Sequence, residues 1–278
     1  MEITRGLAEL AEAGFMEAYE TGAPAEVREA LGIATTRIGG GVALAARELP
    51  VSIWTRALGF GITEPITAEV LGEIVEFYRS NDVPAVALQI APSSLPPGWA
   101  ELSAAHGITR GAAWVKLGAA IEELEPKVST RLGVGPVAPG EAERWAAVIL
   151  RGYGDSNEYV ARMLAAGVAH PDFRAYAAWD GRELVAGGSL YVHGLVGSLN
   201  TAATLPDQRR NGAQTALISM RVEAARREGC RWVVAETGLP AEGTSNPSLD
   251  NLERAGLRQL YIRHNWVWRA ADDPSGRR

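Results

Sequence analysis

Cysteine is almost absent from this sequence, which has one, Cys230, among 278 residues. A single cysteine cannot form a disulfide framework within the chain, so a reducing compartment is the natural expectation. No histidine lies near it in the sequence, and a thiol needs such a partner to become a strong nucleophile. We therefore expect Cys230 to be a buried structural residue.

Lysine and net positive charge are also scarce. The lysines are Lys116 and Lys127 alone, the net charge is −6 and the pI is about 5.4. Proteins that coat nucleic acids normally carry a basic face, so a nucleic-acid partner is not expected. The four histidines do not pair with one another, with cysteine or with carboxylates at metal-ligand spacing, so no metal is expected either.

Long hydrophobic runs are missing. No stretch of 18 apolar residues occurs, and residues 1–14 lack the basic and apolar regions of a signal peptide. We therefore expect a cytoplasmic protein with no membrane partner. Hydrophobic residues still make up 47% of the chain and charged residues 22%, which predicts a globular core rather than disorder.

A segment of mixed charge, glycine and proline divides the chain almost evenly. Residues 122–145 have weak periodicity and are typical of a linker with short extended pieces. We predict two units, residues 1–125 and 126–278. In the second unit the pattern predicts two helices, three strands, a helix, a strand, a short helix and a last strand, which is an α/β (α+β) fold with a mixed sheet.

One hairpin in this unit has a strong local signal. Asp180 and Gly181 stand between two predicted strands, and this pair favours a type I′ turn in which both residues have positive φ.

The ends of the two units resemble each other. Residues 85–117 and 232–268 each contain a strand, a proline-containing loop, a short helix that ends in glycine and an aliphatic residue, and a strand that bears tryptophan. This repetition predicts an internal duplication. Chance similarity between two common connections is the alternative.

The segment TLPDQRRNGAQTALISM, residues 204–220, has the strongest functional signal. It places Arg209, Arg210 and Gly212 at the start of a predicted helix, where unpaired backbone N–H groups and the helix dipole favour an anion. Glycine lacks a Cβ and would allow the backbone to approach a phosphate closely. The alternative is an ordinary solvated loop that binds no ligand. Neither GxxxxGK[ST] nor a GxGxxG between strand and helix occurs, so the common nucleotide loops are excluded.

Residues Arg209 to Gln214 resemble the [QR]-x-x-G-x-[GA] loop that binds the acyl-CoA pyrophosphate in the GNAT N-acetyltransferase family. Gln214 departs from the pattern, which has Gly or Ala there. The resemblance covers about residues 137–269, including a short helix that Asn246 opens and Gly256-Leu257 closes. It implies a tandem GNAT protein. Its C-terminal half would be complete and its N-terminal half a degenerate copy, since residues 58–67 lack Arg-x-x-Gly.

The resemblance implies acetyl-CoA or another acyl-CoA as the acyl donor. A strand before the loop would pair with the pantetheine arm, backbone N–H groups of the loop would hold the pyrophosphate, and the short helix would flank the thioester. The residues in these positions are Ala203, Thr204, Leu205, Arg209, Arg210, Asn211, Gly212, Ala213, Gln214, Thr215, Asn246 and Asn251.

Catalytic residues are less clearly marked. Many relatives carry a tyrosine in the short helix as the acid for the thiolate, whereas this chain has Leu252 there. Ser248, Asn251 and Tyr261 are the candidate substitutes, although packing in the last strand is an alternative role for Tyr261. Glu236 and Asp155 are the candidate bases. We predict Glu236, Ser248 and Tyr261 as the catalytic set.

The expected function is an N-acetyltransferase acting on a small-molecule or protein amine, as a monomer or homodimer. A non-catalytic acyl-CoA-binding or regulatory module is an alternative, favoured by the missing tyrosine. A transferase of the same fold that uses aminoacyl-tRNA is a second alternative, and the acidic pI opposes it.

Overall fold

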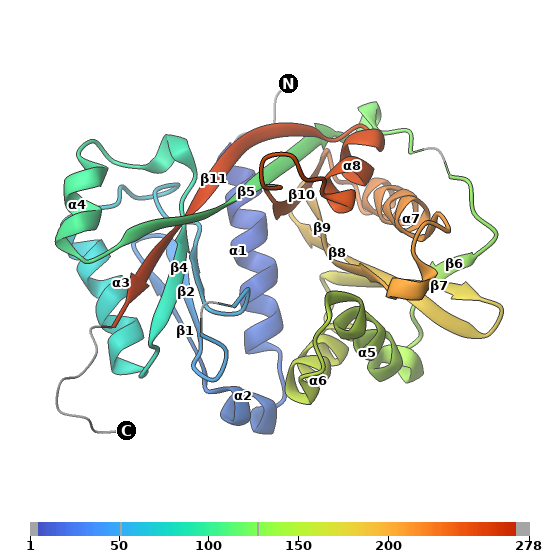
Figure 1. The fold of residues 1–278 in the computed structure, drawn as a ribbon, viewed down its shortest axis with the longest axis horizontal. Helices are drawn as coiled ribbons and strands as arrows, with labels where there is room; N and C mark the ends of the chain where they lie inside the picture. The colour runs from blue at the N-terminus through green and yellow to red at the C-terminus, as the bar shows by residue number, and fades with distance from the viewer. Residues whose placement is uncertain (1–4, 51, 127, 271–278) are drawn as a thin grey trace.

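The computed structural model describes residues 5–50, 52–126 and 128–270, and these form one sheet with helices on both faces (Figure 1). The first half contains α1 (Arg5–Thr21), α2 (Ala25–Leu31), β1 (Ile33–Ile38), β2 (Gly41–Ala46), β3 (Arg56–Leu58), α3 (Ala68–Ser80), β4 (Ala85–Gln89), α4 (Trp99–Ala105) and β5 (Thr109–Ala120). The second half contains β6 (Gly133–Pro136), α5 (Ala142–Tyr153), α6 (Glu158–Gly167), β7 (Phe173–Asp180), β8 (Glu183–His193), β9 (Val196–Thr204), α7 (Ala213–Arg227), β10 (Trp232–Gly238), α8 (Pro247–Arg254) and β11 (Arg258–Arg269).

The two halves share one strand pattern. In the first, β1, β2 and β3 are antiparallel neighbours and β4 joins β3 in parallel. In the second, β7, β8 and β9 are antiparallel neighbours and β10 joins β9 in parallel. A helix, α3 or α7, connects the parallel pair in each half, as parallel strands require. The mixed α/β fold class is thereby confirmed.

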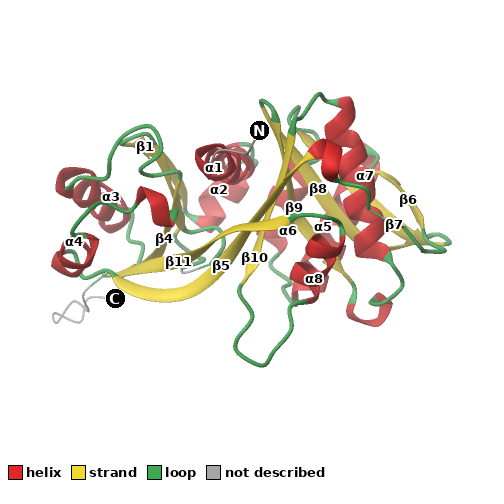
Figure 2. Ribbon diagram, turned by 90° about the horizontal axis from the view of Figure 1, so that it is seen from above, coloured by secondary structure: helices red, strands yellow, loops and turns green. Residues whose placement is uncertain are grey.

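The last strand of each half pairs with the other half. The sheet order is β1-β2-β3-β4-β11-β5-β10-β9-β8-β7-β6. Thus β11 lies between β4 and β5, and residues 114–120 of β5 in turn pair with β10. Figure 2 shows the long β5 and β11 crossing the middle of the molecule. Each half therefore completes its sheet with a strand from the other.

Helix α1 lies across this junction. Its buried side chains, among them Phe15, Met16 and Tyr19, share one core with Leu44 of β2 and with Ile149 of α5. Helices α7 and α8 pack on the opposite face, in a separate core with β5 and β10. None of the described helices is long and apolar enough to cross a membrane.

A row of buried charges fixes α1 to the central strands. Glu9 and Glu12 of α1 form ion pairs with Arg263 of β11, and Glu12 also pairs with Lys116 of β5. Burial would raise the pKa of Glu12, but these cations, with Arg56, lower it to about 2. The stabilisation from Glu12 is therefore complete above its ordinary pKa of 4.5 and is lost as the pH falls towards 2.

Glu20, near the end of α1, has the opposite character. Its side chain is fully buried, and neither carboxylate oxygen has a hydrogen-bond partner among the described residues. Burial raises its pKa well above the ordinary value, so the folded protein holds a proton that the unfolded chain releases. This group therefore reduces stability as the pH rises above 4.5.

We expect Glu20→Met to stabilise the protein by about 1–3 kcal/mol at pH 7, because it removes a buried polar group that lacks a partner. The gain should shrink as the pH is lowered to 5. Urea unfolding at both pH values measures it. Glu29→Met, on the exposed side of α2, is the matched control and should change stability by no more than about 0.5 kcal/mol. A destabilised Glu20→Met protein would contradict this account.

The turn between β7 and β8 differs from the expected one. Asp180 and Glu183 pair as the last residues of the ladder, so the turn consists of Gly181 and Arg182. Among Asp180 and Gly181 only the glycine has positive φ, 61°. The type I′ prediction with positive φ at both residues is wrong. Glycine at the first central position is the pattern of a type II′ turn.

Candidate functional site

Strands β9 and β10 are neighbours that separate after a short stretch. They pair only where Val196–Ser198 faces Trp232–Val234, although β9 continues to Thr204 and β10 to Gly238. Past this point the two facing edges have no strand between them in the described chain. Except where side chains bond them, as Arg221 does the carbonyl of Asn200 and Asn246 that of Gly238, the backbone groups of these edges are open to an extended ligand.

A bulge shapes β9 at this opening. Its register with β8 shifts between Gly187 and Ser189, and Thr201 has a positive φ of 48°. A bulge leaves backbone groups outside the ladder, and Arg221 of α7 bonds two of them. Its Nη1 donates to the carbonyl oxygens of Ser189 and Asn200, at 3.2 and 3.3 Å. The buried guanidinium thus holds the bulge in place.

Arg221 is 2% exposed and has no ion pair with any described carboxylate. Its Nε donates to the carbonyl oxygen of Leu217, one turn earlier in α7. Burial lowers its pKa to about 10, so it remains a cation at neutral pH.

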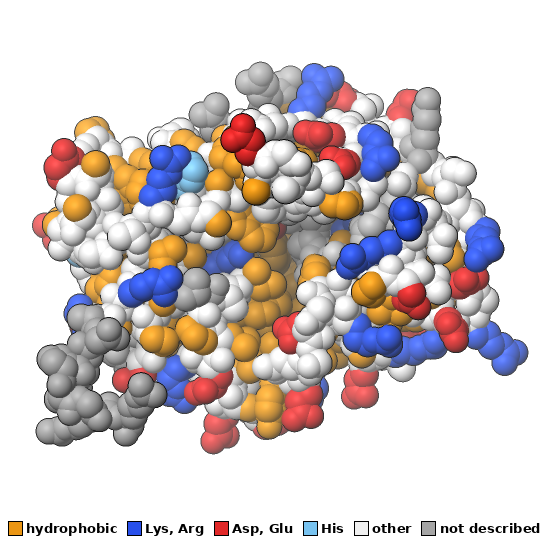
Figure 3. Space-filling model, in the orientation of Figure 1, with side chains coloured by type: hydrophobic (Ala, Val, Ile, Leu, Met, Phe, Trp, Pro, Cys, Tyr) orange, Lys and Arg blue, Asp and Glu red, His pale blue; other side chains and the backbone are white. Residues whose placement is uncertain are grey.

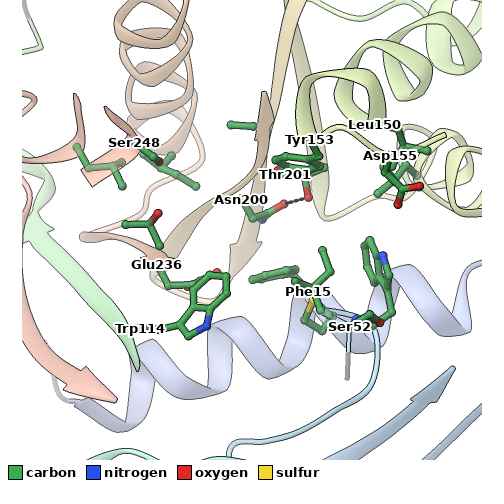
Figure 4. Close-up of a pocket in the computed structure, with 18 of the residues that line it drawn as sticks. Phe15, Ser52, Trp114, Leu150, Tyr153, Asp155, Asn200, Thr201, Glu236 and Ser248 are labelled. Atoms are coloured by element: carbon green, nitrogen blue, oxygen red, sulfur yellow. Dashed lines mark hydrogen bonds between the residues drawn. The ribbon is translucent and has the colours of Figure 1, made fainter. Parts of the chain in front are cut away.

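A cavity of about 500 Å³ lies where the strands part. Its lining includes Ile218 and Leu252 from the α7–α8 face and Phe15 and Leu150 from the α1–α5 face, so it passes through the sheet. On the molecular surface the region between the halves is hollowed, with hydrophobic side chains along the hollow (Figure 3). Figure 4 shows Phe15 on α1 below the bulge residues Asn200 and Thr201, whose side chains are hydrogen-bonded at 3.0 Å.

Glu236, on β10, is the buried carboxylate of this cavity. Its Oε2 accepts a hydrogen bond from Nζ of Lys116 at 3.0 Å. Burial raises its pKa, and the charge of Glu12 raises it further, while Lys116 acts in the opposite direction. A carboxylate with a raised pKa is a better proton acceptor than an ordinary glutamate.

Tyr153, the last residue of α5, is a cavity residue that the sequence does not mark as functional. As a whole it is half exposed, at 50%. Desolvation of its hydroxyl raises its pKa, while Arg221 and a hydrogen bond with the Ala202 backbone act to lower it. The hydroxyl is therefore a protonated donor beside the bulge. Its position between two glycines, Gly152 and Gly154, is the only local signal.

Several solved structures superpose on the whole chain. A GCN5-related N-acetyltransferase from Kribbella flavida matches with a TM-score of 0.64 at 17% identity, over 96% of this chain and 97% of its own. One from Sphaerobacter thermophilus gives 0.59 at 16%, over 97% and 94%. A tandem GNAT protein from the clavulanic acid biosynthesis pathway gives 0.59 at 17%, over 96% and 95%. This chain has the GCN5-related N-acetyltransferase fold. Its sequence matches no family model and no curated protein.

Within this GCN5-related fold, the predicted loop surrounds the start of α7. Arg210 and Gly212 have positive φ, 67° and 79°, and no side chain caps the first turn of the helix. Arg209 and Arg210 are exposed, and Nη2 of Arg209 donates to the carbonyl oxygen of Gly152 at 3.2 Å. The site thus has free helix N–H groups with positive charge beside them.

The structure gives a reason for glycine at position 212 within the protein itself. A Cβ at this position would overlap the backbone carbonyl of Ser129. Thr130, the next residue of the linker, donates its hydroxyl hydrogen bond to the carbonyl oxygen of Asn211 at 2.6 Å. Glycine is therefore needed for its positive φ and for the close passage of residues 129–130, and the expected close approach of a phosphate stays a prediction.

Gln214, which departs from the loop pattern of GCN5-related proteins, lines the cavity. Its Nε2 donates to Oγ1 of Thr204 at 3.2 Å, so the side chain bridges the first turn of α7 and the end of β9. The larger side chain is accommodated because it lies along the strand. Ala203, Thr204 and Leu205 are themselves buried at this strand end, and Asn211, Ala213 and Thr215 flank the helix start.

The short helix α8 lies beside the same opening. Ser248 and Asn251 line the cavity, and Oδ1 of Asn251 accepts a bond from Nη2 of Arg254 at 2.8 Å. Asn246 caps α8, since its Oδ1 accepts from the backbone N–H of Ser248 at 2.9 Å, and it also donates to the carbonyl of Gly238 at 2.7 Å. Asn246 thus joins α8 to the end of β10.

Tyr261 lies apart from these residues. It is 7% exposed, its hydroxyl donates to Oε1 of Glu9 at 2.6 Å, and it is not among the cavity-lining residues. Burial raises its pKa strongly, and Glu9 adds to the effect. Tyr261 therefore belongs to the group of buried charged residues that joins α1 to the central strands. Asp155 lines the cavity at its outer part, where its carboxylate accepts the N–H of Asn157 at 2.9 Å.

Proposed function

We propose that this protein transfers an acyl group, acetyl in the simplest case, from acyl-CoA to an amine. The observation that supports this most is the cavity through the sheet, which runs from Gln214 at the start of α7 to Glu236 on β10. One end offers an anion site for the pyrophosphate and the other a proton acceptor. The extended arm of acyl-CoA would pass through the opening between β9 and β10, from the anion site to the proton acceptor.

The proposed donor contacts follow from this arrangement. Backbone N–H groups of residues 210–215 would bind the pyrophosphate, with Arg209 and Arg210 adding charge. The edge of β9 near Ala203 to Leu205 would pair with the pantetheine arm, and Asn246, Ser248 and Asn251 would flank it from α8. Bound acyl-CoA supplies the thioester carbonyl that the amine attacks.

The proposed reaction is direct transfer. The amine nitrogen bonds to the thioester carbon, the carbon–sulfur bond breaks, and the products are an amide and CoA. Glu236 accepts the proton that the amine loses, directly or through water. The hydroxyls of Tyr153 and Ser248 line the cavity, and they would hydrogen-bond the carbonyl or the departing sulfur. Tyr261 is not proposed as the acid, because its hydroxyl bonds to Glu9.

Acetyl-CoA titrated by calorimetry, followed by a thiol-release assay with amines, tests this function. Gln214→Glu is the sharpest variant, because an acid in the first turn favours the helix but repels a pyrophosphate. We expect at least tenfold weaker acetyl-CoA binding with no loss of Tm.

Gln259→Glu makes the same chemical change at an exposed position of β11 and should bind as the unaltered protein does. Equal acetyl-CoA affinity in Gln214→Glu and Gln259→Glu would show that the pyrophosphate does not bind at the start of α7. Absence of any acetyl-CoA binding by the unaltered protein would reject the function itself.

A further inference from the structure

The two ends of the cavity have different chemical character. The amide and hydroxyl side chains of its lining that lie towards the proposed donor are Gln214 of α7, Thr237 of β10, and Ser248 and Asn251 of α8. The part that α1, α5, α6 and the segment before β3 enclose is mainly apolar and aromatic. It is lined by Phe15, Met16, Trp54, Leu150 and Leu164.

This apolar end belongs to the core of the protein rather than to its surface. Met16 is 3% exposed, Leu164 1% and Trp54 6%. All three belong to the core that joins the two halves. The shape of this end is therefore fixed by packing on several sides, and it is made by both halves together.

The cations that border the cavity are already bonded within the protein. Arg56 donates from Nη1 to Gln89 at 2.9 Å, and its guanidinium lies 4.7 Å from the centre of the Trp114 ring. Arg221 bonds the carbonyl groups of the β9 bulge. These bonds turn both guanidinium groups towards the protein, and Nε of Arg56 has no hydrogen-bond partner among the described residues.

Carboxylates are equally few. Glu236 and Asp155 are the acids in the lining. Asp155 is exposed, and its Oδ1 accepts the two backbone N–H groups that follow it. A polyamine or an aminoglycoside carries several ammonium groups, and each needs an anionic or strongly polar partner once it leaves water. This lining offers Glu236 to one amine and apolar surface to the rest of the molecule.

We propose that the acceptor is a primary amine on an apolar body of aromatic size, without a carboxylate. Its ring lies between Phe15, Met16 and Trp54, and its nitrogen faces the opening between β9 and β10 near Glu236. Transfer forms the nitrogen–carbon bond and breaks the carbon–sulfur bond of acyl-CoA, and Glu236 takes the proton. This inference rests on the proposed acyl transfer and adds the chemical class of the acceptor.

The test is a comparison of kcat/KM, with acetyl-CoA held constant, for 2-phenylethylamine, phenylalanine, spermidine, kanamycin and a lysine peptide. We expect 2-phenylethylamine to exceed each of the others by at least tenfold, the discrimination that apolar contacts alone supply. Preference for any of the other four overturns the inference while leaving acyl transfer intact. Binding of acetyl-CoA without transfer to any amine rejects both.

Met16→Gln tests the location, because it keeps the length of the side chain and adds an amide to the apolar end. We expect kcat/KM for 2-phenylethylamine to fall about tenfold, with acetyl-CoA affinity unchanged. Leu195→Gln, at a residue 52% exposed in the β8–β9 turn, is the control and should have no effect. Ile53→Gln, at a residue 38% exposed at the rim, tests the same end where folding is not at risk. Unchanged kinetics in both Met16→Gln and Ile53→Gln would overturn the assignment.

Discussion

A chain that ends at Gly256, and so lacks β11, is expected not to fold. In the sheet β4 and β5 meet only through β11, so its removal divides the sheet into two pieces. It also removes Arg263, which leaves Glu9 and Glu12 buried with too few cations. Losing one partner of a buried ion pair alone costs about 3–5 kcal/mol, against a total stability of about 5–15 kcal/mol.

Circular dichroism and thermal unfolding check this expectation. The control ends at Ala270, retains every strand and should unfold at the same temperature as the full chain. A cooperative transition in the chain that ends at Gly256 would mean that β4 and β5 can pair directly. Residues 1–125 and 126–278 produced as separate fragments should not fold alone but should associate when mixed, because each completes the sheet of the other.

Glu236→Gln is expected to lower kcat by roughly 10²–10⁴-fold, the usual contribution of a positioned proton acceptor. The amide keeps the shape of the side chain and an oxygen for Lys116, so folding and acetyl-CoA affinity should change little. Steady-state kinetics beside calorimetry separate the two quantities. Glu253→Gln on the exposed side of α8 is the matched control and should retain full activity.

The pH dependence gives a second measure of the same residue. Because the pKa of Glu236 is raised, its active carboxylate form is lost at a higher pH than for an ordinary glutamate. Activity should therefore fall on the acid side from above pH 4.5. Lys116 lowers this pKa, so Lys116→Met should move the acid limb to higher pH. If Lys116→Met leaves the acid limb of the activity–pH profile unchanged, and Glu236→Gln retains full kcat, then Glu236 is not the base.

Local patterns in the sequence predict much of the second half of the fold. The predicted order of two helices, three strands, a helix, a strand, a short helix and a last strand is the order from α5 to β11. Periodicity and capping act over a few residues, so a single sequence displays them. The exchange of β5 and β11 has no such signal, because it depends on which of several apolar strands meet in space.

The site was predictable in part for the same reason. Glu236 lies near the end of β10, and Gln214, Ser248 and Asn251 lie in the first two turns of α7 and α8. All four line the cavity. Arg221 was not predictable, because its partners are carbonyl groups that only the bulge in β9 releases. The apolar end of the cavity is also non-local, since α1, α5 and α6 meet there. The catalytic and donor-binding roles, and the degenerate character of the first half, remain predictions.

The exchange of last strands has a consequence for synthesis of the chain on the ribosome. The edge of β4 is complete only when β11 has emerged, and roughly 170 residues separate these strands. At roughly 5–20 residues per second this takes on the order of ten to thirty seconds. For that time the newborn first half carries an unpaired, apolar strand edge, which is a template for misassociation with neighbouring chains. Chaperone demand should therefore depend on how fast the second half of the message is translated.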